Sequence, residues 1–474
     1  MLRNKFWLLF ALAAVGFIPT IWFYYVGEEA VFPLAAIELF QRQADWLDKT
    51  RYGIPLRQNP LFMWSIIPLS ELAGWTHMLE VIRLIALAAS LGTGLVLAWL
   101  TRQLTRDPMF AAFTALTYVT LADLLFYRGW LAYVDPLYSL CIFSAIALLW
   151  SGTLRNRLLP VATGLCLLTC AFLFKTFTSY VFYGVVFAAL VIQNRAFLLS
   201  WRVIALHLIA FSFPLFWYAL ILGGGGGQSH FMLSEAAGKY TELNLKEYAG
   251  TLASYPFEVL LRLSPAAPIA LYYYKRSKMQ EMPRWWKAAL LSCVVGLLPY
   301  WFAPVSAARY LMPLYPLFAL TIAWPIWCAG ERAVSTASRW FIGMIALQWA
   351  LTLVIFPYYQ QHFRGENYYT TAQNIMRETG DLPLYATDAS AAGMSVVAYI
   401  DSMNTRPALM APPEHWQNGY VISYQASPEL GTVYRQYKLG GDTMYLLCRG
   451  TACKGLSPDL PRPDPAQSAP HQPS

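Results

Sequence analysis

About eleven stretches of the chain are apolar and nearly free of charge over the roughly 20 residues that a helix needs to cross a bilayer. Composition agrees, because 57% of the residues are hydrophobic and only 13% are charged, whereas about 25% are charged in an average soluble domain. The sequence therefore predicts a polytopic α-helical membrane protein with about 11 transmembrane helices. Their expected positions are residues 6–26, 84–101, 108–127, 132–151, 158–174, 176–194, 203–222, 256–274, 288–305, 310–329 and 340–357.

The first apolar stretch follows Arg3 and Lys5, as the apolar part of a signal peptide would. Its apolar run is longer than the roughly 7–15 residues of such a region, so we expect a helix that is retained.

The distribution of Lys and Arg predicts the orientation. With a cytoplasmic N-terminus, the segments between spans that fall inside are rich in cations and poor in acids, which is the positive-inside pattern. This pattern accounts for most of the net charge of +8 without a nucleic-acid partner. We therefore expect a multi-pass protein of the inner (plasma) membrane, with residues 27–83, 223–255 and everything after about 358 outside, in the periplasm. The inside cations are Arg3, Lys5, Arg102, Arg106, Arg155, Arg157, Arg195, Arg202, Lys275, Arg276, Lys278, Arg284, Lys287, Arg332 and Arg339, and the inside acids are Asp107, Glu281 and Glu331.

The outer segments have recognisable local patterns. Within residues 30–75, "AVFPLAAIELF" has apolar residues at helical spacing with Glu38 on the other side, which predicts amphipathic helices lying on the outer face. The "GGGGG" run at 223–227 is either a flexible joint or the hinge of a loop that closes over a substrate.

Composition changes after Pro357 and predicts a small external α/β domain over residues 358–455. "ENYYTTAQNIMRETG" is typical of a helix that stops at Gly380, and "LPLYA", "GYVISYQ" and "DTMYLLCR" are typical of short strands. Cys448 and Cys453 are close enough for a small-loop disulfide in an oxidising compartment. Residues 456–474 are too rich in proline to pack, so we expect disorder there.

Acids at the outer ends of membrane helices are candidates for chemistry, because a charge at mid-bilayer costs about 2.5–3.5 kcal/mol and needs a reason. Glu28 and Glu29 directly follow the first predicted span, and Asp135 begins the fourth. Five cations share this side of the membrane. They are Arg57, Arg128, Lys175, Lys239 and Arg309.

Such a set suits a reaction on an anionic substrate in the membrane. The cations would hold a phosphate, and a carboxylate would take a proton from an incoming nucleophile. The alternative for each residue is structural, since the acids can be solvated loop residues and Lys175 and Arg309 can extend to lipid headgroups.

Five segments of the chain resemble, in order, the motifs of the polyprenyl-phosphate-sugar glycosyltransferases of the protein O-mannosyltransferase and lipid A aminoarabinose transferase type. They cover roughly residues 28 to 325. The segments are "GEEAVFPLAAIELFQRQADW" with "YGIPLRQNPLFMW", "YVDPLYSLCIF", "LFKTF", "SEAAGKY" and "SAARYLMPLYPLFAL".

The resemblance implies a GT-C fold, with a transmembrane catalytic domain over residues 1–357, and inverting transfer of a sugar from a polyprenyl-phosphate donor on the non-cytoplasmic face. It assigns Glu28 and Asp135 to the two acidic positions and Glu29 to the second member of the first acidic pair. Lys175, Lys239 and Arg309, with Tyr310 beside the last, take positions that hold the donor phosphate.

Three departures from the family pattern concern the first external loop. Glu28 stands where the family usually has aspartate, Val31 stands where it has arginine, and Gln58 stands at its lysine position with Arg57 beside it. These changes keep the reaction class and leave the sugar and the acceptor open among glycolipids such as lipid A, polysaccharides and proteins.

A sugar on polyprenyl phosphate already carries its leaving group, so we expect no cofactor. The chain has no P-loop and no GxGxxG motif. His230 is the one histidine of the 223–255 loop, without an accompanying DxD or HxxxH pattern, so a metal site is not predicted and metal dependence is left open. Tyr24, Tyr25, Trp130, Tyr133 and Tyr138 either line a sugar pocket or form an interfacial aromatic belt.

Two alternative functions compete with transfer. A lipid-linked sugar flippase would also have intramembrane charges, but the acids gather on one side, no internal repeat is visible and only Asp123 is a candidate mid-span charge. A non-catalytic envelope scaffold would not need both acidic motifs, which are present.

Overall fold

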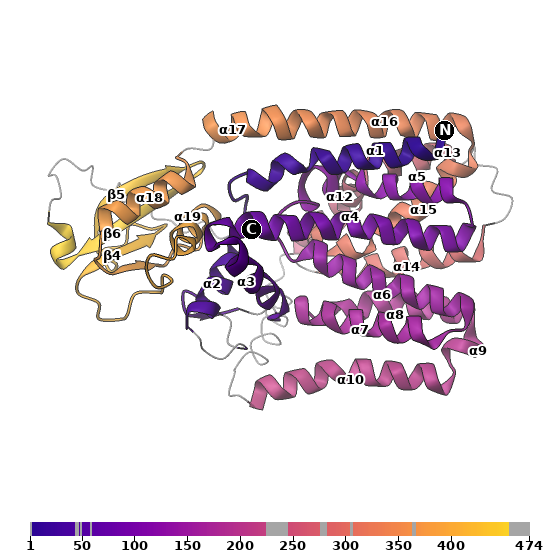
Figure 1. Ribbon diagram of the computed structural model, residues 1–474, viewed down its shortest axis with the longest axis horizontal. Coiled ribbons are helices and arrows are strands. Elements are labelled where there is room, and N and C mark those ends of the chain that lie inside the picture. The colour runs from indigo at the N-terminus through magenta and orange to yellow at the C-terminus, as the bar shows by residue number, and fades with distance from the viewer. Residues whose placement is uncertain are drawn as a thin grey trace. The chain divides into compact units, whose positions relative to one another are not determined.

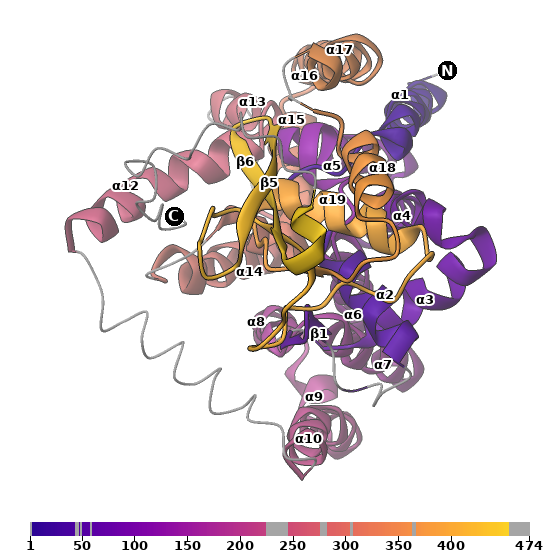
Figure 2. The same ribbon diagram turned by 90° about the vertical axis from the view of Figure 1, so that its left-hand side faces the viewer.

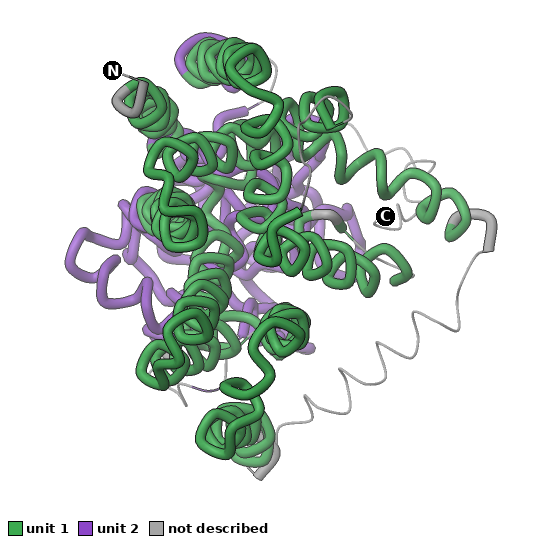
Figure 3. The backbone as a smooth tube through the Cα atoms, turned by 90° about the vertical axis from the view of Figure 1, so that its right-hand side faces the viewer, with its two compact units in different colours: residues 1–21, 57–62, 82–352 green, residues 22–56, 63–81, 353–474 purple. Residues whose placement is uncertain are grey.

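The computed structural model describes residues 2–42, 47, 50–56, 59–223, 245–274, 282–303, 307–362 and 366–454. Contacts divide the chain into two compact units (Figure 3). Unit 1 comprises residues 1–21, 57–62 and 82–352, and unit 2 comprises residues 22–56, 63–81 and 353–474.

Unit 1 is a bundle of helices, several of which run side by side along its length in Figure 1. Its helices are α1 (Leu2–Gly16), α4 (Met78–Thr105), α5 (Pro108–Val119), α6 (Asp135–Arg155), α7 (Leu158–Phe174), α8 (Thr178–Val191), α9 (Arg195–Leu198), α10 (Trp201–Gly223), α12 (Leu245–Arg262), α13 (Ala266–Tyr274), α14 (Arg284–Trp301), α15 (Tyr315–Cys328) and α16 (Glu331–Ala350). Short 3-10 or π segments, η1 (Ile18–Trp22), η3 (Leu124–Arg128), η4 (Ala308–Leu314) and η5 (Leu351–Ile355), extend or link them.

Six segments of the described chain are long and apolar enough to cross a membrane: Lys5–Trp22, Trp75–Thr105, Asp135–Arg155, Trp201–Leu220, Arg309–Cys328 and Glu331–Gln360. Each overlaps one of the predicted spans. Shorter apolar helices, among them α5, α7 and α8, correspond to three more. The chain is therefore a multi-pass membrane protein.

Two predicted spans are wrong as single helices. The predicted helix 256–274 is broken between Arg262 and Ala266, because Pro265 has no N–H to continue the backbone ladder. The predicted helix 108–127 ends at Val119, and the chain then continues as the π-helical η3.

Local sequence sets several helix ends. The Asp107 carboxylate caps α5 by accepting the N–H groups of Met109 and Phe110 at 2.8 and 3.1 Å, and Pro108 fits the first turn. Asn156 ends α6 in the left-handed conformation that asparagine tolerates.

Unit 2 contains a four-stranded sheet with the order β3 (Leu384–Ala386), β4 (Gly419–Ser423), β6 (Asp442–Arg449) and β5 (Thr432–Leu439). β3 pairs with β4 in parallel, with Tyr385 opposite Val421, and the other pairs are antiparallel. The helices α18 (Tyr368–Thr379) and α19 (Ala391–Ser402) lie beside the sheet (Figure 2). The remaining elements of unit 2 are α2 (Val31–Arg42), β1 (Thr50–Arg51), β2 (Ile54–Pro55), α3 (Leu61–Ala73), η2 (Trp75–His77), α17 (Phe356–His362) and η6 (Gly450–Cys453).

The predicted helix ending at Gly380 and the three predicted strands are confirmed, whereas β5 and α19 were not predicted. β5 is an edge strand with exposed Arg435 and Gln436, so its apolar signal is weak. Cys448 and Cys453 form the predicted disulfide. Residues 224–227 of the glycine run and the tail 456–474 lie outside the described residues.

The prediction that Glu38 lies on a polar face of an amphipathic helix is wrong. Its side chain is buried in α2, which packs on α19 within unit 2. The carboxylate accepts hydrogen bonds from the Thr50 hydroxyl and, at 3.2 Å, from the Gly53 N–H. The β1–β2 hairpin thus supplies the partners that a buried acid requires.

Asp388 is a second buried acid of unit 2, and only one of its two carboxylate oxygens accepts a hydrogen bond from the described residues. Asp388 accepts the N–H of Ser390 at 2.7 Å through Oδ1, while Oδ2 has no hydrogen-bond partner among the described residues. Its carboxyl group packs so closely on Gly393 that a Cβ there would overlap it. Burial raises the pKa of the Asp388 carboxyl to about 6.

Candidate active site

Asp135 is the first residue of α6, where free backbone N–H groups favour a negative charge. Pro136 follows it, and proline is suited to the first turn because it has no N–H to leave unpaired. The sequence thus places a carboxylate at the predicted outer end of a membrane helix and fixes its backbone.

Lys175 is the partner of Asp135. It lies directly after the last residue of α7, and its ammonium donates to Asp135 Oδ1 at 2.5 Å. The two side chains are 15% and 13% exposed, so the pair is shielded from water but still accessible. An ammonium has three N–H donors. Within the described part of the chain, Asp135 takes one of them, which leaves two for another anion.

Asn59 lies two residues before the start of α3 and connects this part of the chain to the pair. Its side-chain amide donates to the Phe172 carbonyl at 2.8 Å, and its backbone N–H donates to the Lys175 carbonyl at 3.4 Å. Trp217 of α10 donates to Asn59 Oδ1 at 3.2 Å. Asn59 thereby satisfies the carbonyl groups at the end of α7 and holds Lys175 in place.

Tyrosine side chains form a wall beside the Lys175 ammonium. The rings of Tyr138 and Tyr310 lie 5.6 and 5.2 Å from Nζ, within the range of cation–π attraction. The Tyr138 hydroxyl is hydrogen-bonded to Thr178 at 2.7 Å, and the Arg309 guanidinium lies 5.3 Å from the Tyr310 ring. Asp135, Lys175, Arg309 and Tyr310, all predicted site residues, are therefore brought together within unit 1.

Arg128 lies at the end of η3, five residues after Asp123 and seven before Asp135. Its guanidinium lies 4.6 and 5.6 Å from the rings of Tyr127 and Tyr133, and its buried Nε has no hydrogen-bond partner among the described residues. Arg128 thus packs against Tyr133, two residues before Asp135. Among the described residues, no hydrogen bond or ion pair joins it to the Asp135–Lys175 pair.

Gly129 shapes the turn that follows Arg128. Its N–H donates to the Leu124 carbonyl at 3.0 Å, and a Cβ at this position would overlap that carbonyl oxygen. The Gly129 carbonyl in turn accepts from the Ser90 hydroxyl at 2.8 Å. Only glycine allows this close approach, so the loop before Asp135 depends on it.

Arg83 is a buried cation that the sequence analysis did not single out. Its guanidinium donates to the Thr20 carbonyl at 2.8 Å and lies 5.5 Å from the Trp130 ring, with no exposed surface. It therefore connects the end of the first membrane segment with the loop that leads to Asp135.

Asp123 belongs to a second buried cluster in unit 1. It accepts from Arg262 at 2.5 Å and from the Tyr315 hydroxyl at 2.7 Å, and Arg262 also donates to Glu258 at 2.7 and 3.0 Å. The acid is thus paired with a cation of α12, and the pair connects α12, η3 and α15.

Glu28 and Glu29 lie in unit 2, before α2. Glu29 is fully buried and accepts the N–H of Val26 at 2.6 Å, whereas Glu28 is exposed. Tyr25, in the same segment, packs on Tyr399 of α19 at 4.9 Å between ring centroids. Two predicted site residues, Arg57 and Lys239, lie outside the described residues, as do Gln58 and His230.

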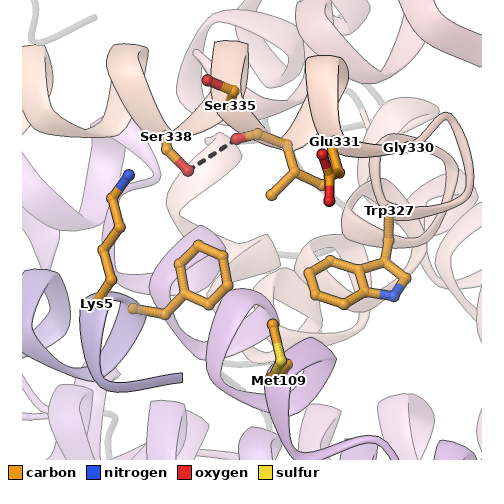
Figure 4. A pocket seen from close by; sticks show the side chains of 9 residues that line it. Lys5, Met109, Trp327, Gly330, Glu331, Ser335 and Ser338 are labelled. Atoms are coloured by element: carbon orange, nitrogen blue, oxygen red, sulfur yellow. Dashed lines mark hydrogen bonds between the residues drawn. The ribbon is translucent and has the colours of Figure 1, made fainter. Parts of the chain in front are cut away.

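Among the described residues, no group of three or more His, Cys, Asp or Glu side chains is arranged to hold a metal ion. A cavity of about 450 Å³ lies elsewhere in unit 1, between Lys5 on one side and Glu331 on the other (Figure 4). Its lining includes Phe6 and Trp327, whose ring centroids are 6.3 Å apart. It is formed by α1, α5, α15 and α16, none of which carries a predicted site residue.

The helical bundle and the small mixed sheet together define a membrane protein with the GT-C fold. Two solved structures carry this comparison, ArnT from Cupriavidus metallidurans bound to undecaprenyl phosphate and the same protein in the apo state. The TM-scores are 0.68 and 0.69, with 14% and 13% sequence identity, and each match covers 94% of this chain and 98% of ArnT.

The fold that the sequence resemblance implied is thus confirmed. No protein-family model and no curated protein matches the chain by sequence.

Proposed function

We propose that this protein is an inner-membrane glycosyltransferase that moves a sugar from a polyprenyl-phosphate donor to an envelope acceptor on the periplasmic face. The observation that carries this proposal is the Asp135–Lys175 pair, whose ammonium lies beside the rings of Tyr138 and Tyr310 in a chain with the GT-C fold. Undecaprenyl phosphate is bound in one of the ArnT structures, so a lipid-linked donor of that type suits the same fold.

In this proposal the acceptor oxygen attacks the anomeric carbon as the bond to the donor phosphate oxygen breaks, and the configuration is inverted. Negative charge grows on the departing lipid phosphate. Lys175 and Arg309 would bind that charge more strongly in the transition state than in the ground state. Lys239 and Arg57 would add to the phosphate site, and Arg128 would hold the approach to it.

A carboxylate is needed where positive charge develops on the sugar and where an acceptor hydroxyl loses its proton. Asp135 is suited to this role, because Lys175 occupies only Oδ1 and leaves Oδ2 for the substrate. Glu28 and Glu29 are the other candidates. An acceptor phosphate would need no base, and the donor already carries its leaving group, so we propose that no cofactor takes part.

Mass spectrometry of envelope lipids and glycoproteins tests the proposal in cells that lack this chain. We expect one pentose- or hexose-sized adduct to disappear, to return with the wild type and to stay absent with Asp135→Asn. Asp442→Asn, an exposed acid of unit 2, is the control and should restore the adduct. Full restoration by Asp135→Asn would contradict the assigned role, and an unchanged adduct profile would favour the lipid-linked sugar flippase or the scaffold.

A further inference from the structure

A basic cavity lies in unit 1 at the opposite end of α6 from Asp135. Its volume is about 580 Å³, and six residues line it: Trp99, Arg102, Gln103, Arg106, Leu154 and Arg155. α6 has 21 residues, so about 30 Å of helix separates this cavity from the candidate active site. Any function of the cavity is therefore distinct from sugar transfer.

The charged lining of this cavity is entirely cationic. Arg102, Arg106 and Arg155 contribute three guanidinium groups, and none of them forms an ion pair within the described part of the chain. The adjacent acid, Asp107, is directed to the α5 N–H groups that it caps. Three unpaired cations at one cavity repel one another, and a bound anion would relieve that repulsion.

Gln103 adds a further donor. Its Oε1 accepts from the Ser151 hydroxyl at 2.9 Å and from Arg155 at 3.1 Å, and these two donors fix the orientation of the amide. Nε2 is consequently buried with no hydrogen-bond partner among the described residues. A buried donor without an acceptor points to a ligand that supplies acceptor oxygens.

The two apolar residues of the lining, Trp99 and Leu154, indicate that the bound anion is the headgroup of a lipid. Trp99 and Leu154 are 42% and 50% exposed, and both lie on helices that are long and apolar enough to span the membrane. Apolar surface at such a position faces acyl chains, and basic pockets between membrane helices on the cytoplasmic side are suited to acidic headgroups.

We propose that this cavity binds the phosphate headgroup of an anionic glycerophospholipid, with its acyl chains along Trp99 and Leu154. The three arginines and Gln103 Nε2 would surround the phosphate oxygens with charge-assisted hydrogen bonds. The charge pattern of the chain predicts that this end of the bundle faces the cytoplasm, so the lipid would come from the inner leaflet. The proposal does not depend on the proposed transferase activity.

Native mass spectrometry of the full-length protein tests this, after equilibration with equal amounts of phosphatidylglycerol and phosphatidylcholine. The wild type should retain one phosphatidylglycerol per chain, and the triple variant Arg102→Gln, Arg106→Gln, Arg155→Gln should retain it at least about tenfold less well. Gln103→Glu should reduce the retention of phosphatidylglycerol by a similar factor, because it places a carboxylate beside the bound phosphate while all three arginines remain.

The matched control is the triple variant Arg195→Gln, Arg202→Gln, Arg284→Gln. It removes the same charge from exposed positions that are predicted to lie on the same side of the membrane, and it should bind like the wild type. Equal retention by the wild type and Gln103→Glu would overturn the proposal, as would an equal loss in the control, which would indicate general surface attraction. Displacement of the lipid by the same concentration of glycerol 3-phosphate would show that the site takes a soluble phosphate, and would overturn the assignment to lipid. Gln103→Glu also decides the question if the triple variant fails to fold.

Discussion

Lys175 and Asp135 are forty residues apart in the sequence, yet their side chains form one ion pair at the ends of neighbouring helices. A pair that is mostly shielded from water is sensitive to the loss of either partner, because the remaining charge is then uncompensated. Lys175 donates to Asp135, and in the proposed reaction it also donates to the substrate phosphate. Its two roles can be separated by comparing single and double variants.

Lys175→Met is expected to lower the transfer rate at least about 100-fold, because a fixed cation at the leaving phosphate is lost. Asp135→Asn should have a loss of similar size, and the double variant should be little worse than either single variant, since the two groups act as a unit. Single-turnover rates with a purified donor measure this. Lys438→Met, at an exposed position in unit 2, should keep the wild-type rate. Fully additive losses in the double variant would show that the two residues act independently.

The stability of unit 2 is expected to depend on pH because Asp388 is buried. Burial raises the pKa of its carboxyl in the folded state to about 6, whereas the pKa of an aspartate in an unfolded chain is about 4. The folded state therefore holds the proton more tightly, and stability decreases as the pH rises through this window. Asp388→Asn stays neutral and should not show that decrease.

Hydrogen exchange in peptides that cover α19 measures this difference, with the wild type and the variant compared at equal pH. Above pH ~6 the variant should be protected about 100-fold better, since each unit of pKa corresponds to a factor of ten and the pKa of Asp388 is raised by about two. Below pH ~4 the two should agree. A wild type that is better protected at neutral pH would contradict the expected sign.

At the scale of elements, the turn from η3 into α6 fixes where Asp135 stands. Gly129 has no room for a side chain beside the Leu124 carbonyl, and Ser90 and Arg83 of α4 hold the turn from the other side through Gly129 and Trp130. The turn is therefore specified by several weak contacts rather than by one motif.

Gly129→Ala should displace this turn and lower kcat by about tenfold or more, because even a small displacement of a reacting group lowers the rate strongly. Gly184→Ala in α8 is the matched control, since a Cβ there meets nothing within 4 Å. It should leave kcat unchanged and stabilise the helix by about 0.5–1 kcal/mol. Thermal unfolding and initial rates of the two variants test this, and equal behaviour of both would exclude a special role of the turn.

The helices and strands with strong periodic signals could be predicted from the sequence, as could the placement of Asp135 and Lys175 at helix ends. Pairings over long separations could not. Asp123 and Arg262 are 139 residues apart, and no local pattern indicates that they meet. Arg83 was overlooked because it immediately precedes the predicted span 84–101, whereas α4 begins at Met78 and buries it. Asn59 could not be predicted as a site residue, because the candidates were chosen by their charge and Asn59 carries none.

At the scale of the whole molecule, the distribution of charge predicts a cytoplasmic N-terminus and a periplasmic unit 2. Cysteines introduced at the exposed positions Arg157 and Glu429 test this orientation with a membrane-impermeant maleimide. Glu429→Cys should be labelled once the outer membrane is permeable, and Arg157→Cys only after the inner membrane is disrupted. Labelling of the wild type, which lacks both introduced cysteines, gives the background. The reverse order of labelling would invert the proposed orientation and with it the face on which transfer takes place.

The two units are interleaved along the chain, which passes from one to the other near residues 21, 56, 62, 81 and 352. A chimera that exchanges only the segment after 352 would leave residues 22–56 and 63–81 from the original parent, with α2 facing a foreign α19. Glu38 would then lie buried against a surface that did not evolve beside it. Recombination between distant relatives should therefore succeed only when all three segments of unit 2 are inherited together. The segment that carries Glu28 would then always be inherited with the four-stranded sheet.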